Sequence, residues 1–151
     1  MINRITSLFS RSLADDGSVA EDEIQIASAA LLVEAACMDG EFDSNERQRI
    51  LYLIVDQFNL NKEEGAILIK EAEKLVDQAG DLYAFTRIVK DKYSMDQRVK
   101  MIEMLWEVAF ADGKADHYEK NLISRVAGLI FVSDKDRGEA RKRVLARLGI
   151  E

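Results

Sequence analysis

The sequence contains no proline, only eight glycines and a single cysteine, Cys37, among its 151 residues. Because proline and glycine form many of the turns of strand-rich folds, their scarcity favours long uninterrupted helices and argues against a β-sandwich or barrel. A lone cysteine excludes an intramolecular disulfide and a cysteine-based zinc cluster, and a reducing cytoplasm is the simplest compartment. The only histidine, His117, cannot supply the paired Glu-x-x-His motifs of a ferritin-like di-iron bundle.

Long apolar runs and an excess of positive charge are also missing. No run approaches the roughly 20 apolar residues of a membrane span. With a formal net charge of −7, the chain is not expected to bind nucleic acid, because neutralising phosphates requires a basic face. Residues 12–46 contain ten acidic residues and no Lys or Arg, whereas basic residues concentrate near the C-terminus. This asymmetry predicts a cationic ligand or a basic partner at one end.

Apolar residues recur at helical spacing in seven segments, which cover about 21–38, 43–58, 62–79, 81–93, 95–111, 116–130 and 133–148. Capping signals open several of them, for example Asn61 with Glu64 and Ser94 with Gln97. No segment shows sustained period-two alternation. We therefore expect an all-α bundle of about seven helices, with an N-terminal segment over 1–20 and a helical domain over 21–151.

The N-terminal segment has apolar residues at helical spacing within 1–13, followed by a polar break at 15–18. One interpretation is an amphipathic helix that lies on an anionic membrane, which would place the protein at the inner face of a membrane. The other is a terminus that caps the core or is loosely held.

A repeated acidic turn dominates the rest of the sequence. The stretch that begins at Asp39-Gly40 and ends at Glu46 returns 73 positions later, from Asp112-Gly113 to Glu119. The similarity extends into the flanking helices, where Glu34 matches Glu107 and Phe58 matches Phe131. We predict two pseudo-symmetric helical hairpins, over about 24–79 and 95–148, which bury their apolar sides against each other.

Helix capping is one explanation of the acidic residues. Asp43 and Asp116 stand where N-caps are expected, and Glu46 and Glu119 follow three residues later, which completes two capping boxes. Gly40 would be a left-handed residue that ends the preceding helix, as would Gly113 in the second turn.

Cation binding is a second explanation, because capping does not require the remaining acids. The candidate ligands form two sets: Glu34, Asp39, Asp43 and Glu46, and Glu107, Asp112, Asp116 and Glu119. Oxygen-only ligands suit Ca²⁺, Mg²⁺ or Mn²⁺. Each turn matches only the second half of an EF-hand loop, since Ala35 and Cys37 fall where its first ligands belong, so any site should be weak. A docking surface for a basic or membrane-associated protein partner is the third explanation, and a carboxylate-bridged metalloenzyme the most remote.

The repeated frame Ala-x-x-Asp-Gly-x-x-Asp-x-x-Glu, over residues 36–46 and 109–119, resembles the TerB-like domains of bacterial tellurite-resistance proteins. The resemblance covers about residues 24–148 and is closest to a stand-alone branch of the family. It implies an all-helical, pseudo-symmetric fold whose paired acidic residues bind a metal. The function expected on this basis is that of a non-enzymatic module that binds a divalent cation in a bacterial tellurite, metal or envelope stress response.

Overall fold

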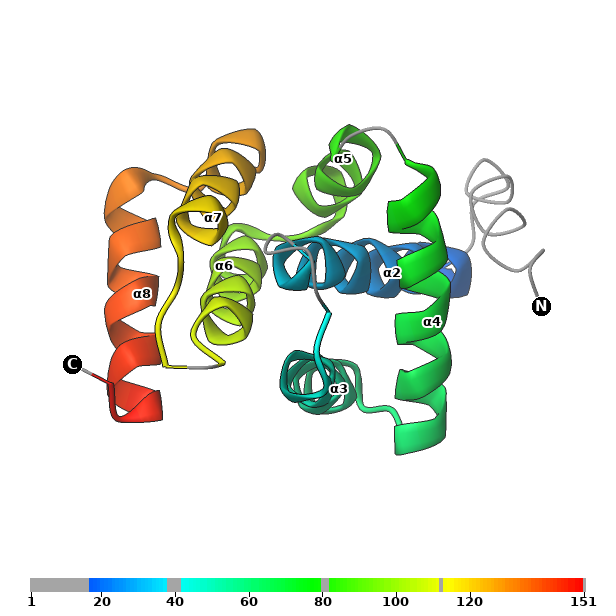
Figure 1. Cartoon of the computed structure of the whole chain (residues 1–151). Helices are drawn as coiled ribbons and strands as arrows, with labels where there is room; N and C mark the ends of the chain where they lie inside the picture. The colour runs from blue at the N-terminus through cyan, green and yellow to red at the C-terminus, as the bar shows by residue number, and fades with distance from the viewer. Residues whose placement is uncertain (1–16, 38–41, 80–81, 112, 151) are drawn as a thin grey trace.

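The computed structural model describes residues 17–37, 42–79, 82–111 and 113–150. Within these ranges the chain forms seven helices and no strand, which confirms the all-α prediction (Figure 1). The helices are α2 (Gly17–Ala36), α3 (Ser44–Phe58), α4 (Lys62–Gln78), α5 (Tyr83–Lys92), α6 (Met95–Ala109), α7 (His117–Leu129) and α8 (Asp134–Leu148). None of these helices is long and apolar enough to cross a membrane.

The helix boundaries follow the local signals closely. Capping boxes open α4 at Asn61 and α6 at Ser94, as predicted. The clearest difference is at α2, which begins at Gly17 rather than near Glu21. Glycine and serine are both common around helix starts, and no proline blocks extension in this direction. The predictions for residues 1–16 lie outside the described residues.

Helices α2 and α6 form the centre of the molecule. Each contacts the other, and α2 is also surrounded by α3, α4, α5 and α7. Every residue from 26 to 33 is therefore buried, as is every residue from 104 to 110. Helical spacing of apolar residues predicts one buried face, but residues 26–33 of α2 are enclosed on all sides because the alanines and Ser28 among them allow neighbouring helices to approach closely.

One glycine sets the approach of α4 to α3. A Cβ atom at Gly65 would lie 2.7 Å from Leu51 Cδ1 and 2.9 Å from Val55 Cγ2, too close for any other residue to fit without displacing these side chains. The short link through Asn59, Leu60 and Asn61 joins these two closely packed helices.

The two halves share their order of elements: α2, α3 and α4 in the first, and α6, α7 and α8 in the second, with α5 as the connection. In both halves the first helix contacts the third, as α2 does α4 and α6 does α8. Superposition of the two backbone paths stays a prediction.

Candidate functional site

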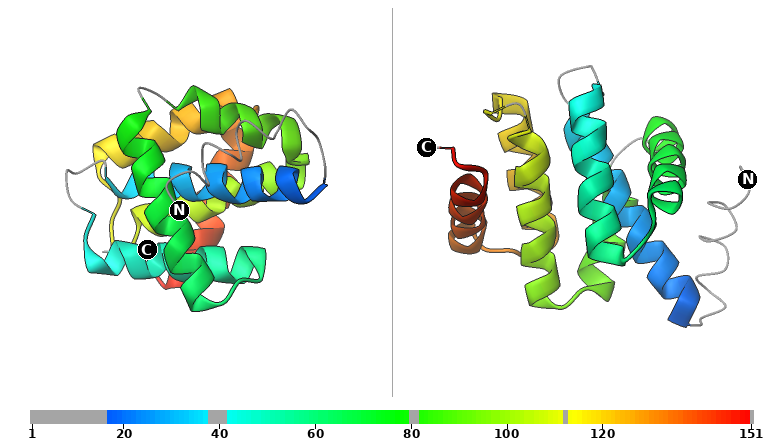
Figure 2. Two further views of the ribbon diagram at one scale, coloured as in Figure 1. Left: turned by 90° about the vertical axis from the view of Figure 1, so that its right-hand side faces the viewer. Right: turned by 90° about the horizontal axis from the view of Figure 1, so that it is seen from below.

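The two acidic turns lie at one end of the molecule. Helices α2 and α6 run in the same general direction, so their C-terminal ends lie on the same side in both views of Figure 2. Helices α3 and α7 begin there and run back. We call this region, where α2 and α6 end and α3 and α7 begin, the acidic end. The fold thus brings the two repeats of the motif to a common surface.

The first turn contains the predicted capping box. Asp43 has extended backbone angles, and its Oδ1 accepts the N–H of Glu46 at 2.8 Å. Glu46 Oε1 in turn accepts the N–H of Asp43 at 3.4 Å. Both N–H groups would otherwise lack partners at the helix start. The carboxylates therefore have a definite structural role in starting α3.

The second turn repeats this geometry almost unchanged. Asp116 Oδ1 accepts the N–H of Glu119 at 2.8 Å, and Glu119 Oε1 accepts the N–H of Asp116 at 3.1 Å. Gly113 has φ of 101°, a positive value that suits glycine, but it lies three residues beyond Phe110, the C-cap of α6, so it does not end that helix as predicted. The prediction for Gly40 lies outside the described residues.

Burial separates the two acids of each box. Glu46 and Glu119 are only 6% and 7% exposed, whereas Asp43 and Asp116 are exposed to solvent. Within the part of the chain that the structure describes, the second carboxylate oxygens of both aspartates have no hydrogen-bond partner. Each turn therefore offers one outward-facing carboxylate oxygen beside a buried glutamate.

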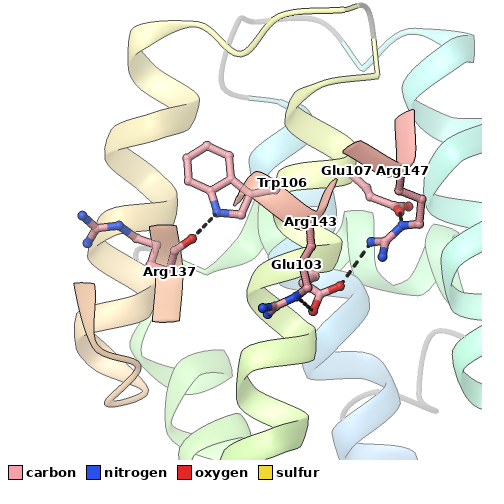
Figure 3. A network of polar contacts seen from close by, with 6 residues as sticks. All are labelled: Glu103, Trp106, Glu107, Arg137, Arg143 and Arg147. Atoms are coloured by element: carbon pink, nitrogen blue, oxygen red, sulfur yellow. Dashed lines mark hydrogen bonds and ion pairs between the residues drawn. The ribbon is translucent and has the colours of Figure 1, made fainter. Parts of the chain in front are cut away.

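The glutamate that precedes the second turn is already neutralised. Glu107 is 5% exposed, and its Oε1 accepts a hydrogen bond from Nε of Arg147 on α8 at 2.8 Å. Arg147 also contacts Glu103 at 3.2 Å, and Arg143 contacts the other oxygen of Glu103 at 3.1 Å (Figure 3). Two arginines of α8 thus hold two glutamates of α6, which gives Glu107 a partner without any metal.

Glu34, the matching glutamate of the first half, has a different environment. It is half-buried in α2, and its carboxylate makes no hydrogen bond or ion pair among the described residues. Burial raises the pKa of Glu34 above its usual range, and the positive charge of Arg125 on α7 partly offsets this rise. Its carboxylate is therefore the least satisfied of the described candidate ligands.

Asp39 and Asp112 lie outside the described residues. Among those that the structure does describe, no three of His, Cys, Asp and Glu lie together in a way that would hold a metal ion. Each turn contributes at most Asp43 with Glu46, or Asp116 with Glu119. A metal site at the acidic end would therefore require Asp39 or Asp112, together with backbone carbonyls or water.

A small hollow at the acidic end was not foreseen from the sequence. It has a volume of about 290 Å³ and is lined by Asn45, Gln48, Arg49 and Tyr52 of α3 together with Ala111, which follows α6. Tyr52 is 63% exposed. Helix α3 of the first half thus lies against the turn of the second half. Periodicity alone could not reveal this, since it identifies buried faces and not which turn a polar face meets.

Other residues considered for chemistry have structural surroundings. His117 is exposed, and its Nε2 lies 3.2 Å from Nδ2 of Asn121 one turn along α7. Trp106 is buried and its indole N–H donates to the carbonyl of Arg137 at 3.3 Å, which joins α6 to α8 (Figure 3). Cys37 packs against the hydrophobic core. Trp106 and Cys37 thus contribute to the packing of the helices.

The fold and the site together define an all-helical protein with two capped acidic turns at one end. A family model described as "Tellurite resistance protein TerB" matches residues 25–142, and the chain belongs to this family. The match runs from α2 into α8 and includes both acidic turns; Arg143 and Arg147 follow it. Comparison with curated proteins and with solved structures gave no match.

Proposed function

We propose that this TerB protein is a non-enzymatic module that binds a divalent cation weakly at the acidic end. The observation that carries the proposal is the pair of capping boxes, because they hold Asp43 with Glu46 and Asp116 with Glu119 in the same geometry on one surface. A cap consumes one oxygen of each aspartate and leaves the other directed to solvent. Caps thus pre-position ligands at no further cost in side-chain entropy.

The donor set suits hard cations. It consists of carboxylates, without a cysteine or histidine among the candidate ligands, and such oxygens are the ligands of Ca²⁺, Mg²⁺ and Mn²⁺. Ca²⁺ takes six to eight oxygens, more than one capping box provides. We therefore assign Asp39 and Asp112 as the ligands that complete the two turns, and we expect Glu34 to contribute before Glu107, whose charge Arg147 neutralises.

Docking of a basic protein segment is a second candidate function for the same surface. It is favoured by the two exposed aspartates at the acidic end. A basic segment needs only exposed negative charge, which Asp43 and Asp116 provide. The two candidates differ in whether a free divalent ion stabilises the protein.

The description of the matching family, a tellurite resistance protein, supports a role in tellurite, metal or envelope stress. His117 is exposed, and its Nε2 lies 3.2 Å from Nδ2 of Asn121 on the same helix. We place the protein in the bacterial cytoplasm, in contact with a protein partner at the inner membrane. These assignments are part of the proposal.

Thermal unfolding with and without divalent ions tests cation binding. The wild type should gain stability by mass action in millimolar Ca²⁺, Mg²⁺ or Mn²⁺, with a Kd on the order of 10⁻⁴–10⁻³ M. The double variant Asp39→Asn with Asp112→Asn should lose this response while keeping a normal Tm without metal, because asparagine serves turns nearly as well as aspartate.

A matched control removes the same charge elsewhere. Asp56→Asn with Asp77→Asn changes two exposed aspartates on α3 and α4, outside the capping boxes. This control should respond to the ions as the wild type does. A wild type whose Tm does not change in any of the three ions would refute cation binding and favour docking of a basic segment.

A further inference from the structure

A groove of about 800 Å³ lies between α5 and the C-terminal end of α7, which are neighbours in Figure 1. Its principal lining residues are Tyr83, Thr86, Arg87, Lys90, Leu129 and Phe131. Two large aromatic residues stand at its edge, since Tyr83 and Phe131 are each 65% exposed. The groove is thus an apolar hollow with aromatic walls, separate from the capped turns.

Phe131 adopts a backbone conformation that bulky residues seldom accept. It has φ of 61° and occupies the left-handed position that ends α7. The N–H of Phe131 donates to Gly128 O at 3.3 Å, and that of Val132 donates to Ala127 O at 2.8 Å, the two bonds of a Schellman motif. Glycine or asparagine is usual at this position.

The other helices that end in this way follow the usual preference. Asn59 ends α3 with φ of 55°, and Gly149 ends α8 with φ of 71°. Only Phe131, of these three left-handed caps, carries a large apolar side chain into solvent. Backbone strain of this kind persists when the rest of the structure enforces it, and it concentrates at binding sites. Phe131 therefore has the features of a binding residue and not of a cap chosen for stability.

The charge of the groove is opposite to that of the whole chain. Arg87 and Lys90 line it, and none of its described lining residues is acidic. Arg87 makes no ion pair within the described part of the chain, and Lys90 has only a long contact of 3.9 Å with Asp91. Lys90 Nζ also lies 5.4 Å from the centre of the Phe131 ring. In a protein of net charge −7, the groove therefore contains two cations and an exposed aromatic ring with one of them beside it.

We propose that the α5–α7 groove binds an acidic segment of a partner protein, one that inserts an aromatic or large aliphatic side chain between Tyr83 and Phe131 and places carboxylates on Arg87 and Lys90. Aromatic residues and arginine are the side chains that dominate binding energy at protein interfaces. Carboxylates complement the two cations and steer the segment into the groove.

This surface is distinct from the acidic end. Helix α7 begins at the acidic turn and reaches the groove only at its C-terminus, about 20 Å away for a helix of this length. A cation or basic segment at the acidic end and an acidic segment in the groove therefore do not compete. The groove proposal does not rest on cation binding.

Selection from a phage-displayed library of random dodecapeptides, followed by calorimetric titration of the enriched peptides, tests the proposal. Enriched peptides should share an aromatic or large aliphatic residue flanked by Asp or Glu. The double variant Arg87→Glu with Lys90→Glu should weaken their binding by about tenfold or more. Higher salt should also weaken binding, because the charges are exposed.

Two further variants alter the groove in proteins that we expect to be more stable than the wild type. Phe131→Gly relieves the left-handed strain and should raise the Tm by about 2–4 °C while weakening peptide binding about tenfold. Gly128→Leu places a side chain into open space at the groove and also favours the helix, so it should block binding in a stable protein.

The controls match these changes on α8. Gly138→Leu also adds a side chain in open space on a helix, and Lys135→Glu with Lys142→Glu reverses two exposed charges. Both should bind the peptides as the wild type does. The proposal is refuted by enriched peptides that lack carboxylates, by the absence of any enrichment, or by peptides that bind Phe131→Gly with unchanged affinity.

Discussion

The two acidic turns have nearly the same local structure but different surroundings. Their capping boxes agree in every hydrogen bond, yet Glu107 is ion-paired to Arg147 whereas Glu34 has no such partner among the described residues. The difference arises in the helix that packs beside each glutamate. A repeated motif thus determines its own turn, and the neighbouring helix determines whether the glutamate before it has an ion-pair partner.

The sequences of α4 and α8 explain this difference. Counted from their N-caps, Asn61 and Ser133, the position of Arg147 in α8 corresponds to Leu75 in α4. Leu75 is half-buried and packs against the core, so α4 has no guanidinium at this position to offer Glu34. Similarly, the left-handed caps of α3 and α7 are Asn59 and Phe131, although Phe58 is the residue that matches Phe131 at a constant separation of 73. Counted from the N-caps Asp43 and Asp116, the left-handed residue therefore comes one position earlier in the second half than in the first.

The largest effect is expected from Arg147→Ala. This change leaves Glu107 buried without its partner, and it should lower the free energy of unfolding by about 2–3 kcal/mol, less than for a fully buried pair because Arg147 is partly exposed. Urea unfolding measures it. Arg143→Ala is the control and should cost less than about 1 kcal/mol, since Arg147 still holds Glu103. Equal losses in the two variants would contradict a special role for the Glu107 pair.

Replacement of the caps should affect the two halves equally. Asp43→Ala and Asp116→Ala each remove one cap and should each lower the free energy of unfolding by about 1 kcal/mol. Asn at either position should cost little, because asparagine caps as well as aspartate. Chemical denaturation of the four variants gives the comparison. A loss in only one half would show that the two capping boxes are not equivalent.

The smallest effect is expected from Glu34→Gln, and it should depend on pH. Burial raises the pKa of Glu34 above 4.5 in the folded protein, so the folded state holds this proton more tightly than the unfolded chain does. Wild-type stability should therefore fall as the pH rises from about 4.5 through the raised pKa. Above that range Glu34→Gln should be the more stable protein, by less than about 1 kcal/mol because the group is half exposed, and below it the two should be equal.

The matching change in the second half should have the opposite sign. Glu107→Gln removes the charge that binds Arg147 and should destabilise the protein at neutral pH. Unfolding of both variants between pH 4 and pH 8 makes the comparison. Stabilisation by Glu107→Gln at pH 7 would mean that the ion pair does not offset the burial of its charges.

Local sequence determined the helices and their starts. The capping boxes at Asp43 and Asp116 join atoms only three residues apart, so the sequence specifies them whatever lies nearby. The absence of proline and the helical spacing of apolar residues likewise determined an all-α chain with seven helices in its described part. The repeated acidic frame pointed to the family that the comparison then showed.

The tertiary structure decided what those elements do. The Arg147–Glu107 pair joins residues 40 positions apart, and the α5–α7 groove depends on two helices that are not consecutive in the chain. The enclosure of residues 26–33 of α2 on all sides likewise follows from the helices packed around them and not from the periodicity of α2. Hydrogen bonds within a turn join residues a few positions apart, so the local sequence determines them. Burial and ion pairing depend on which distant surfaces meet, and that is set only when the whole chain packs.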